Sequence, residues 1–203
     1  MPKKESLMTK AHNERCRDCK ENLHILLATL FDGVQANYDI DFPSRIEDLT
    51  NTNIYADLVP VYQALQKHRG HFEFVKAKKL PRVDFFIPIE KIIIEFDESQ
   101  HFTEPRGIAL NLYPKTKQYG FSVDRWRNLC RDLNKRDNDP PYRDEQRAWY
   151  DALRDFAPQL WETGKTIRLY SRDLVWCSLN LDKESDLEAF KNIILSSAEG
   201  ILL

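Results

Sequence analysis

The stretch that decides the fold runs from Arg82 to Phe102 and reads RVDFFIPIEKIIIEFDESQHF. It contains two short apolar runs, 83–87 and 92–96, which are joined by the four residues Pro-Ile-Glu-Lys. Two such runs with a proline-containing turn between them are typical of a β-hairpin. Three consecutive isoleucines indicate that the second run is buried on both faces, as a strand at the centre of a sheet is. The sequence therefore predicts a hairpin at the centre of the fold.

Three carboxylates interrupt this hairpin: Asp84 in the first strand, and Glu95 and Asp97 at the end of the second. Side chains alternate along a strand, so Glu95 and Asp97 point to the same face, and Asp84 can lie opposite them. Buried ionised carboxylates need a partner, and like charges gathered together repel one another. The pattern predicts a cation at this end of the strands. The alternative is that each acid pairs with a lysine or arginine of a neighbouring helix, or accepts hydrogen bonds from a turn.

The acids suggest a particular chemistry. An aspartate, a glutamate and a backbone carbonyl suit Mg²⁺ (or Mn²⁺), because Mg²⁺ prefers oxygen ligands and keeps several of its waters. Such a water can become the nucleophile that hydrolyses a phosphodiester. Gln100 and His101 follow the second strand at once, and a histidine, with an unperturbed pKa of about 6.5, suits proton transfer. We expect Asp84, Glu95 and Asp97 to hold the metal, Gln100 to position water or substrate, and His101 to relay a proton.

The same residues resemble a known family. Asp84-Phe85 followed by I-I-E-x-D-x-x-Q-H is similar to the core of the PD-(D/E)XK nuclease superfamily and, within it, to the very-short-patch-repair-like endonucleases. The resemblance implies an α/β, restriction-endonuclease-like fold: a central mixed β-sheet flanked by helices, here with an added N-terminal helix. It implies Asp84 and Glu95 as metal ligands, and Asp97 where most of the superfamily has a catalytic lysine. One departure is Glu98, which stands where the family usually has glycine.

Residues and resemblance together predict a metal-dependent endonuclease, a hydrolase that cleaves phosphodiester bonds of nucleic acid, DNA rather than RNA. The alternative is a nuclease-fold module that is catalytically inactive and binds nucleic acid or protein partners. The net charge of −2 and the additional acid at Glu98 favour that alternative. Whether the protein forms a homodimer stays open.

Basic residues accompany the acidic centre along the chain. Five of them are expected to contact phosphates: Lys76, Lys78, Arg82, Arg106 and Arg147. The alternative for the first three is a solvated edge, where lysine discourages pairing with another strand. In the resembled branch a later helix carries an acid and an arginine, which Asp144 and Arg147 match.

The composition is that of an ordinary globular protein, with 203 residues, 42% of them hydrophobic and 31% charged. This length suits a single domain over 1–203. We expect a nuclease-like core at about 55–180, an N-terminal helical extension at about 12–53, and an inserted loop and helix at about 103–140. No apolar run approaches the roughly 20 residues of a membrane span, and the N-terminus lacks a signal-peptide pattern. A cytoplasmic location without a membrane partner is therefore expected.

Apolar periodicity predicts five helices, at about 13–31, 57–69, 122–136, 142–156 and 187–194. Further strands are predicted at 71–77, 166–170 and 175–179. The segment 34–53 reads as a connection with one short helix after Ser44. The segment 103–120 reads as a long irregular loop, either a lid or substrate-contacting flap, or a disordered or purely structural loop. Asp57 and Ser122 are the expected N-caps, and Gly70 the expected end, of their helices.

The sequence has four cysteines: Cys16, Cys19, Cys130 and Cys177. A disulfide is not expected in a cytosolic protein. A zinc site formed by His12, Cys16, Cys19 and His24 has an unusual spacing and no second C-x-x-C to complete it. We therefore interpret Cys16 and Cys19 as small buried hydrophobic residues on one stripe of the first helix.

Overall fold

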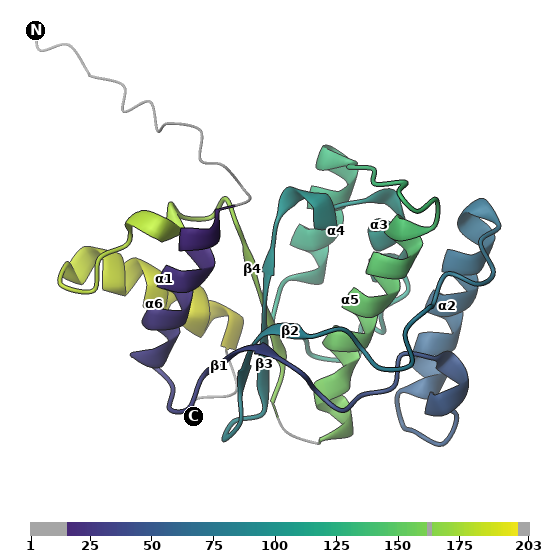
Figure 1. Cartoon of the computed structure of the whole chain (residues 1–203), viewed down its shortest axis with the longest axis horizontal. Coiled ribbons are helices and arrows are strands. Elements are labelled where there is room, and N and C mark those ends of the chain that lie inside the picture. The colour runs from purple at the N-terminus through teal and green to yellow at the C-terminus, as the bar shows by residue number, and fades with distance from the viewer. Residues whose placement is uncertain (1–15, 162–163, 199–203) are drawn as a thin grey trace, which may run out of the picture.

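The computed structural model describes residues 16–161 and 164–198, which are arranged around one four-stranded sheet (Figure 1). The strands are β1 (Gln35–Tyr38), β2 (Val83–Ile87), β3 (Ile92–Asp97) and β4 (Thr166–Tyr170). They lie side by side in this order, and β2 is antiparallel to both β1 and β3, whereas β4 is parallel to β3. The protein is therefore a mixed α/β protein with a mixed sheet.

The predicted hairpin is confirmed as β2 and β3, with Phe85 opposite Ile94. All six residues of β3 are buried, because the strand has a neighbour on each side and helices on both faces. Its parallel neighbour β4 matches the predicted strand at 166–170, and places Arg168 beside Glu95 in the register. The central strand therefore has an arginine next to its first acid.

Six α-helices flank the sheet in the described part of the chain: α1 (Arg17–Ala28), α2 (Tyr55–Arg69), α3 (Glu104–Asn111), α4 (Val123–Leu133), α5 (Arg143–Leu160) and α6 (Glu184–Ala198). All five predicted helices are present, as α1, α2, α4, α5 and α6, and residues 13–15 of the first prediction lie outside the described residues. In Figure 1, α1 and α6 cover one face of the sheet, and α3, α4 and α5 cover the other, with α2 outside α5.

Each face of the sheet has its own hydrophobic core. Ile94 lies in a buried cluster with Leu23 of α1 and Phe190 of α6. The preceding residue, Ile93, lies in a cluster with Trp149 of α5 on the opposite face. Because side chains alternate along the strand, the two acids of β3 share the face of Ile93 and point toward α5. The sheet therefore directs both carboxylates into the interior rather than into solvent.

Three predicted elements differ from the structure. Residues 71–77 form turns and irregular chain instead of a strand, and there Gln146 donates a side-chain hydrogen bond to the Phe74 carbonyl at 2.8 Å. The second is 175–179, where the 3₁₀-helix η3 (Trp176–Ser178) replaces the expected strand. The third is 103–120, which contains α3 instead of being an irregular lid, because Thr103 caps that helix and proline occupies its first turn.

The segment 34–53 contains more structure than predicted. The short helix after Ser44 is confirmed as the 3₁₀-helix η1 (Ile46–Leu49), but the edge strand β1 was missed. A third 3₁₀-helix, η2 (Ser99–His101), follows β3. Four residues with no buried side chain carry little apolar signal, and β1 is identified only by its pairing with β2.

Two of the predicted helix ends are confirmed and one is wrong. Ser122 accepts a hydrogen bond from the Arg125 N–H at 3.2 Å, and Gly70 ends α2 at a φ of 75°. Asp57 is not an N-cap, because α2 begins two residues earlier, and its carboxylate instead forms an ion pair with Lys117. Within 16–161 and 164–198, every helix is too short or too polar to cross a lipid bilayer.

Candidate functional site

Asp84 and Glu95 lie next to each other on adjacent antiparallel strands, one step along the register from Phe85 and Ile94. The Asp84 N–H donates to Oε1 of Glu95 at 3.2 Å. In return, the Phe96 N–H donates to Oδ2 of Asp84 at 2.9 Å. Each carboxylate is thus held by the backbone of the opposite strand. The structure therefore brings together two of the three predicted metal ligands.

Each member of this carboxylate pair also has a basic partner. Nζ of Lys20, on α1, lies 2.6 Å from Oδ1 of Asp84. Nε of Arg154, on α5, lies 3.3 Å from Oε1 of Glu95. The side chains of Lys20 and Asp84 are 41% and 21% exposed, whereas those of Arg154 and Glu95 are 10% and 5% exposed. The pair therefore opens to solvent on the side of Asp84 and Lys20.

Glu95 is the acid whose burial is least well compensated. Burial raises its pKa, as does the charge of Asp84, while Arg154 and Arg168 lower it, and the result is a pKa of about 7. At 3.3 Å, the ion pair with Arg154 is longer than those that hold Asp84, Asp97 and Asp155, and Nε of Arg154 is buried without a hydrogen bond. Near neutral pH this carboxyl is thus balanced between its neutral and charged forms, and an additional cation would favour the charged one.

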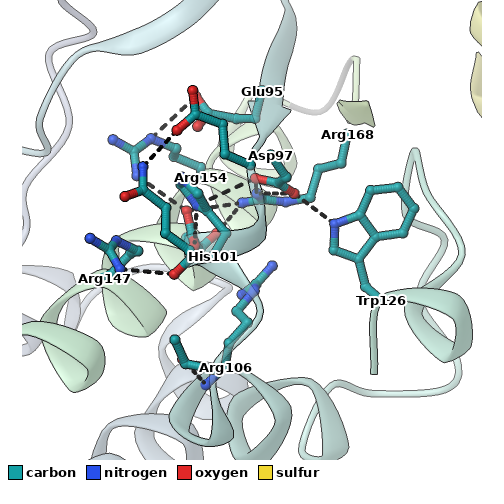
Figure 2. A network of polar contacts seen from close by, with 12 residues as sticks. Glu95, Asp97, His101, Arg106, Trp126, Arg147, Arg154 and Arg168 are labelled. Atoms are coloured by element: carbon teal, nitrogen blue, oxygen red, sulfur yellow. Dashed lines mark hydrogen bonds and ion pairs between the residues drawn. The ribbon is translucent and has the colours of Figure 1, made fainter. Parts of the chain in front are cut away.

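Asp97 lies deeper, at 1% exposure, and its carboxylate is fully engaged (Figure 2). One guanidinium nitrogen of Arg168 donates to both oxygens, at 2.8 and 3.0 Å. The Trp126 indole N–H donates to Oδ2 at 2.6 Å. Asp97, the third predicted ligand, therefore lies apart from the Asp84–Glu95 pair, and its carboxylate is occupied by Arg168 and Trp126.

Arg168 is the centre of this deeper cluster and is itself 1% exposed. Besides Asp97, it donates through Nε to Asp155 at 2.6 Å and through Nη2 to the Asp151 carbonyl at 3.1 Å. Asp155 also accepts from Arg106, again at 2.6 Å. Burial of several charges is tolerated here because each has a close partner of opposite sign.

His101 faces two of these acids. Its Nδ1 lies 3.2 Å from Oδ2 of Asp151 and 3.4 Å from Oδ1 of Asp97. Burial acts to lower the pKa of His101, but the charge and hydrogen bond of Asp151 and the charge of Asp97 outweigh it, and the pKa is raised. The three groups are close enough to ligate one ion. Arg168, however, is already bound to both aspartates, so a protonated His101 satisfies the position with less repulsion than a dication.

Gln100 takes a different direction from the predicted one. Its side-chain amide donates to Glu98 at 2.8 Å, and its carbonyl accepts a hydrogen bond from Arg147 at 2.9 Å. Arg147 also binds Asp137 at 3.0 Å. These contacts hold the turn after β3, and Gln100 is directed toward Glu98 rather than toward Asp84 and Glu95.

The predicted phosphate contacts separate into exposed residues and residues that bind other groups of the protein, as Arg147 binds the Gln100 carbonyl and Asp137. Lys76, Lys78 and Arg82 are exposed and can reach a polyanion. The prediction for Arg106 is wrong, because this residue is 1% exposed and binds Asp155 and the hydroxyl of Tyr113. The sequence placed Arg106 in an irregular loop, but it lies in α3, which packs against α5 and directs it inward.

Sequence reasoning missed the basic and acidic partners that complete the site. They are Lys20 on α1, and Asp151, Arg154 and Asp155 on α5. The positions 151, 154 and 155 follow i, i+3, i+4 spacing, so they share one face of the helix. A stripe of charged residues on one face of a helix that also carries buried apolar residues was the sequence signal that could have identified these partners. The acid and arginine matched by resemblance, Asp144 and Arg147, lie two turns earlier and bind other groups: the Asp137 N–H and the Gln100 carbonyl.

Comparisons of this chain with protein-family models, with curated proteins and with solved structures found no match.

Proposed function

We propose that this protein is a metal-dependent nuclease that hydrolyses phosphodiester bonds of nucleic acid, DNA rather than RNA. The observation that carries the proposal is the reciprocal pairing of Asp84 and Glu95 across β2 and β3, at the solvent-facing end of an otherwise buried ionic cluster. Two adjacent carboxylates, one of them poorly compensated, are the oxygen ligands that Mg²⁺ or Mn²⁺ accepts.

The residues present fit such an ion. Asp84 and Glu95 would hold it, and the metal would supply an activated water and neutralise charge on the phosphate. Lys20, which binds Asp84 at 2.6 Å, is the mobile partner, because its side chain is 41% exposed and flexible. Released from Asp84, its ammonium can contact a phosphate oxygen. Arg154 stays beside Glu95 and keeps that carboxylate aligned.

The deeper residues take positioning roles in this proposal. Asp97, bound by Arg168 and Trp126, fixes the end of β3 from which Glu95 projects. His101, at 21% side-chain exposure, is the group of this cluster from which a proton can reach the solvent side. In the nuclease branch that Asp84, Glu95 and Asp97 resemble, the core is followed by a helix and a strand with an arginine. Arg168 on β4, which follows α5, matches this order and supports a restriction-endonuclease-like fold.

The experiment is cleavage of end-labelled single- and double-stranded DNA and RNA in Mg²⁺, in Mn²⁺ and in a chelator. We expect metal-dependent cleavage that falls at least about 100-fold in both Asp84→Asn and Glu95→Gln, because changing a residue that only hydrogen-bonds to a metal ligand already costs about 10–100-fold. Asp124→Asn, an exposed acid of α4, is the matched control and should keep full activity. If His101→Ala and Asp151→Asn abolish metal binding while Asp84→Asn does not, the cation lies in the deeper cluster and the assignment is wrong.

A second function is favoured by one specific observation. The ionic cluster holds as many basic as acidic groups when His101 is protonated: Asp84, Glu95, Asp97, Asp151 and Asp155 against Lys20, His101, Arg106, Arg154 and Arg168. Such a cluster is stable without a metal and suits a nuclease-fold module that binds nucleic acid or protein. Metal-independent retention of labelled nucleic acid without cleavage, with binding reduced by Lys78→Glu, would select this function over the nuclease.

A further inference from the structure

Three cysteines from separate parts of the sequence converge where α1 meets η3. The Sγ atoms of Cys16, Cys19 and Cys177 lie within 4.8 Å of one another. Cys16 is the N-cap residue of α1 and Cys19 lies in its first turn, where the Cys19 N–H donates to the Cys16 carbonyl at 3.2 Å. Residues three apart share one side of a helix, so both thiols point toward η3. None of the three forms a disulfide.

The third cysteine is held in place by hydrogen bonds on both sides of it. The side-chain amide of Asn22, on α1, donates to the carbonyl of Trp176 at 2.7 Å and to that of Leu179 at 2.9 Å. Trp176 is fully buried, and its indole N–H donates to the Tyr170 carbonyl at 3.2 Å. The segment that carries Cys177 is therefore anchored both to α1 and to the end of β4.

We propose that Cys16, Cys19 and Cys177 bind one thiophilic divalent cation, zinc, with water as the fourth ligand. Zinc binds thiolates at about 2.3 Å in a tetrahedron, which places the sulfur atoms about 3.8 Å apart. The observed separations, all within 4.8 Å, need only small side-chain rotations to reach this arrangement. A disulfide would join two sulfurs and leave the third unused, whereas a zinc ion uses all three.

The proposed ligands differ from the zinc site considered in the sequence analysis, in which two histidines accompanied Cys16 and Cys19. His24 is not part of the cluster, because its Nε2 lies 3.2 Å from the Val34 carbonyl and its ring packs against Phe85. His12 lies outside the described residues. Cys19 is 1% exposed, as a buried hydrophobic residue would be, but Cys177 is exposed, so an ion can enter from solvent. Binding replaces one proton on each thiol by a bond to the metal, without a redox step.

The site has a structural consequence. Zinc would join the first turn of α1 to the segment after β4, which are more than 150 residues apart in the sequence. Lys20, the partner of Asp84, directly follows Cys19. The proposed zinc site thus fixes the part of α1 that reaches the acidic pair, yet it contains none of the residues proposed for catalysis.

The test is titration of the reduced, metal-free full-length protein with Co²⁺, followed by displacement with Zn²⁺. We expect one equivalent of Co²⁺ to produce intense sulfur-to-cobalt charge-transfer absorption that Zn²⁺ removes. Cys177→Ser should weaken binding at least tenfold, and Cys177→His should restore it, because imidazole also ligates zinc. Cys130→Ser, at a buried cysteine of α4 on the other face of the sheet, should bind as the wild type does.

Two results would overturn the proposal. One is the absence of charge-transfer absorption in wild-type protein whose cysteines titrate as free thiols. The other is equal cobalt affinity in wild type and Cys177→Ser, with circular dichroism showing both to be folded. Asp84→Asn should keep the cobalt signal, so failure of the nuclease proposal and failure of this one give different results.

Discussion

Glu95→Gln should stabilise the protein, by an amount that depends on pH. Glu95 is buried beside Asp84, and burial is the main reason why its pKa rises from 4.5 to about 7. The folded state therefore prefers the protonated form more than the unfolded state does. The stability associated with that form is fully present below pH 4.5 and is lost as the pH rises toward 7. Glutamine has nearly the same shape and stays neutral, so it avoids this loss.

The magnitude follows from the two pKa values. The interval from 4.5 to about 7, at about 1.4 kcal/mol per pH unit, corresponds to about 3 kcal/mol at pH 8. The same linkage gives about 1 kcal/mol at pH 5 and about 2 kcal/mol at pH 6. These values already include the ion pair with Arg154, because the charge of Arg154 lowers the pKa of Glu95 from which they are calculated.

The assay is urea unfolding at pH 5, 6 and 8 in a chelator, followed by tryptophan fluorescence. Glu188→Gln, on an exposed position of α6, is the control and should differ from wild type equally at all three pH values. If Glu95→Gln is less stable than wild type at pH 8, or if their difference does not change with pH, Glu95 is well compensated and the reasoning fails.

Magnesium extends the same experiment to the proposed function. A ligand at ten times its Kd stabilises the folded state by about 1.4 kcal/mol. At pH 8, Mg²⁺ should therefore raise the free energy of unfolding of the wild type but not of Glu95→Gln. Equal stabilisation of both proteins would place the cation elsewhere.

Three further changes test other parts of the cluster. Arg168→Met leaves three buried aspartates without their shared partner and should lower the free energy of unfolding by about 3–5 kcal/mol. The control is the exposed Arg131→Met, which should change the free energy of unfolding by less than about 0.5 kcal/mol. Equal effects of the two substitutions in urea unfolding would contradict the reasoning. The pKa of His101 is raised above 6.5 in the folded state, so the stability that its charged form contributes is present below pH 6.5 and is lost as the pH rises through that folded-state pKa. Urea unfolding should therefore show a larger difference between wild type and His101→Gln at pH 5.5 than at pH 9. The opposite trend would refute a charged histidine. Lys20→Met should change the free energy of unfolding by less than about 1 kcal/mol, because the ion pair with Asp84 is partly exposed. It should also raise the affinity for Mg²⁺ in calorimetric titration, because no ammonium then competes for Asp84. A lower affinity would show that Lys20 supports the metal site.

Local patterns in the sequence were enough to predict the hairpin and most of the helices. The run of three isoleucines identified β3 as a central strand, and alternation along it correctly set Glu95 and Asp97 on one face. Ser122 and Gly70 marked helix ends, because a hydroxyl cap and a left-handed glycine satisfy groups within a few residues. These features depend on neighbours in the chain, so one sequence is enough to predict them.

The tertiary structure alone decided which charges meet. Asp84 and Glu95 approach each other through the β2–β3 pairing, but their partners Lys20 and Arg154 come from 64 and 59 positions away along the chain. A lone arginine such as Arg106 looks the same in sequence whether it lies in solvent or in the core. Its environment is set by which helices pack together, and that is a sum of many weak contacts over the whole fold. For this reason the acids could be found from the sequence, whereas the ionic cluster around them, and the three thiols gathered at η3, could not.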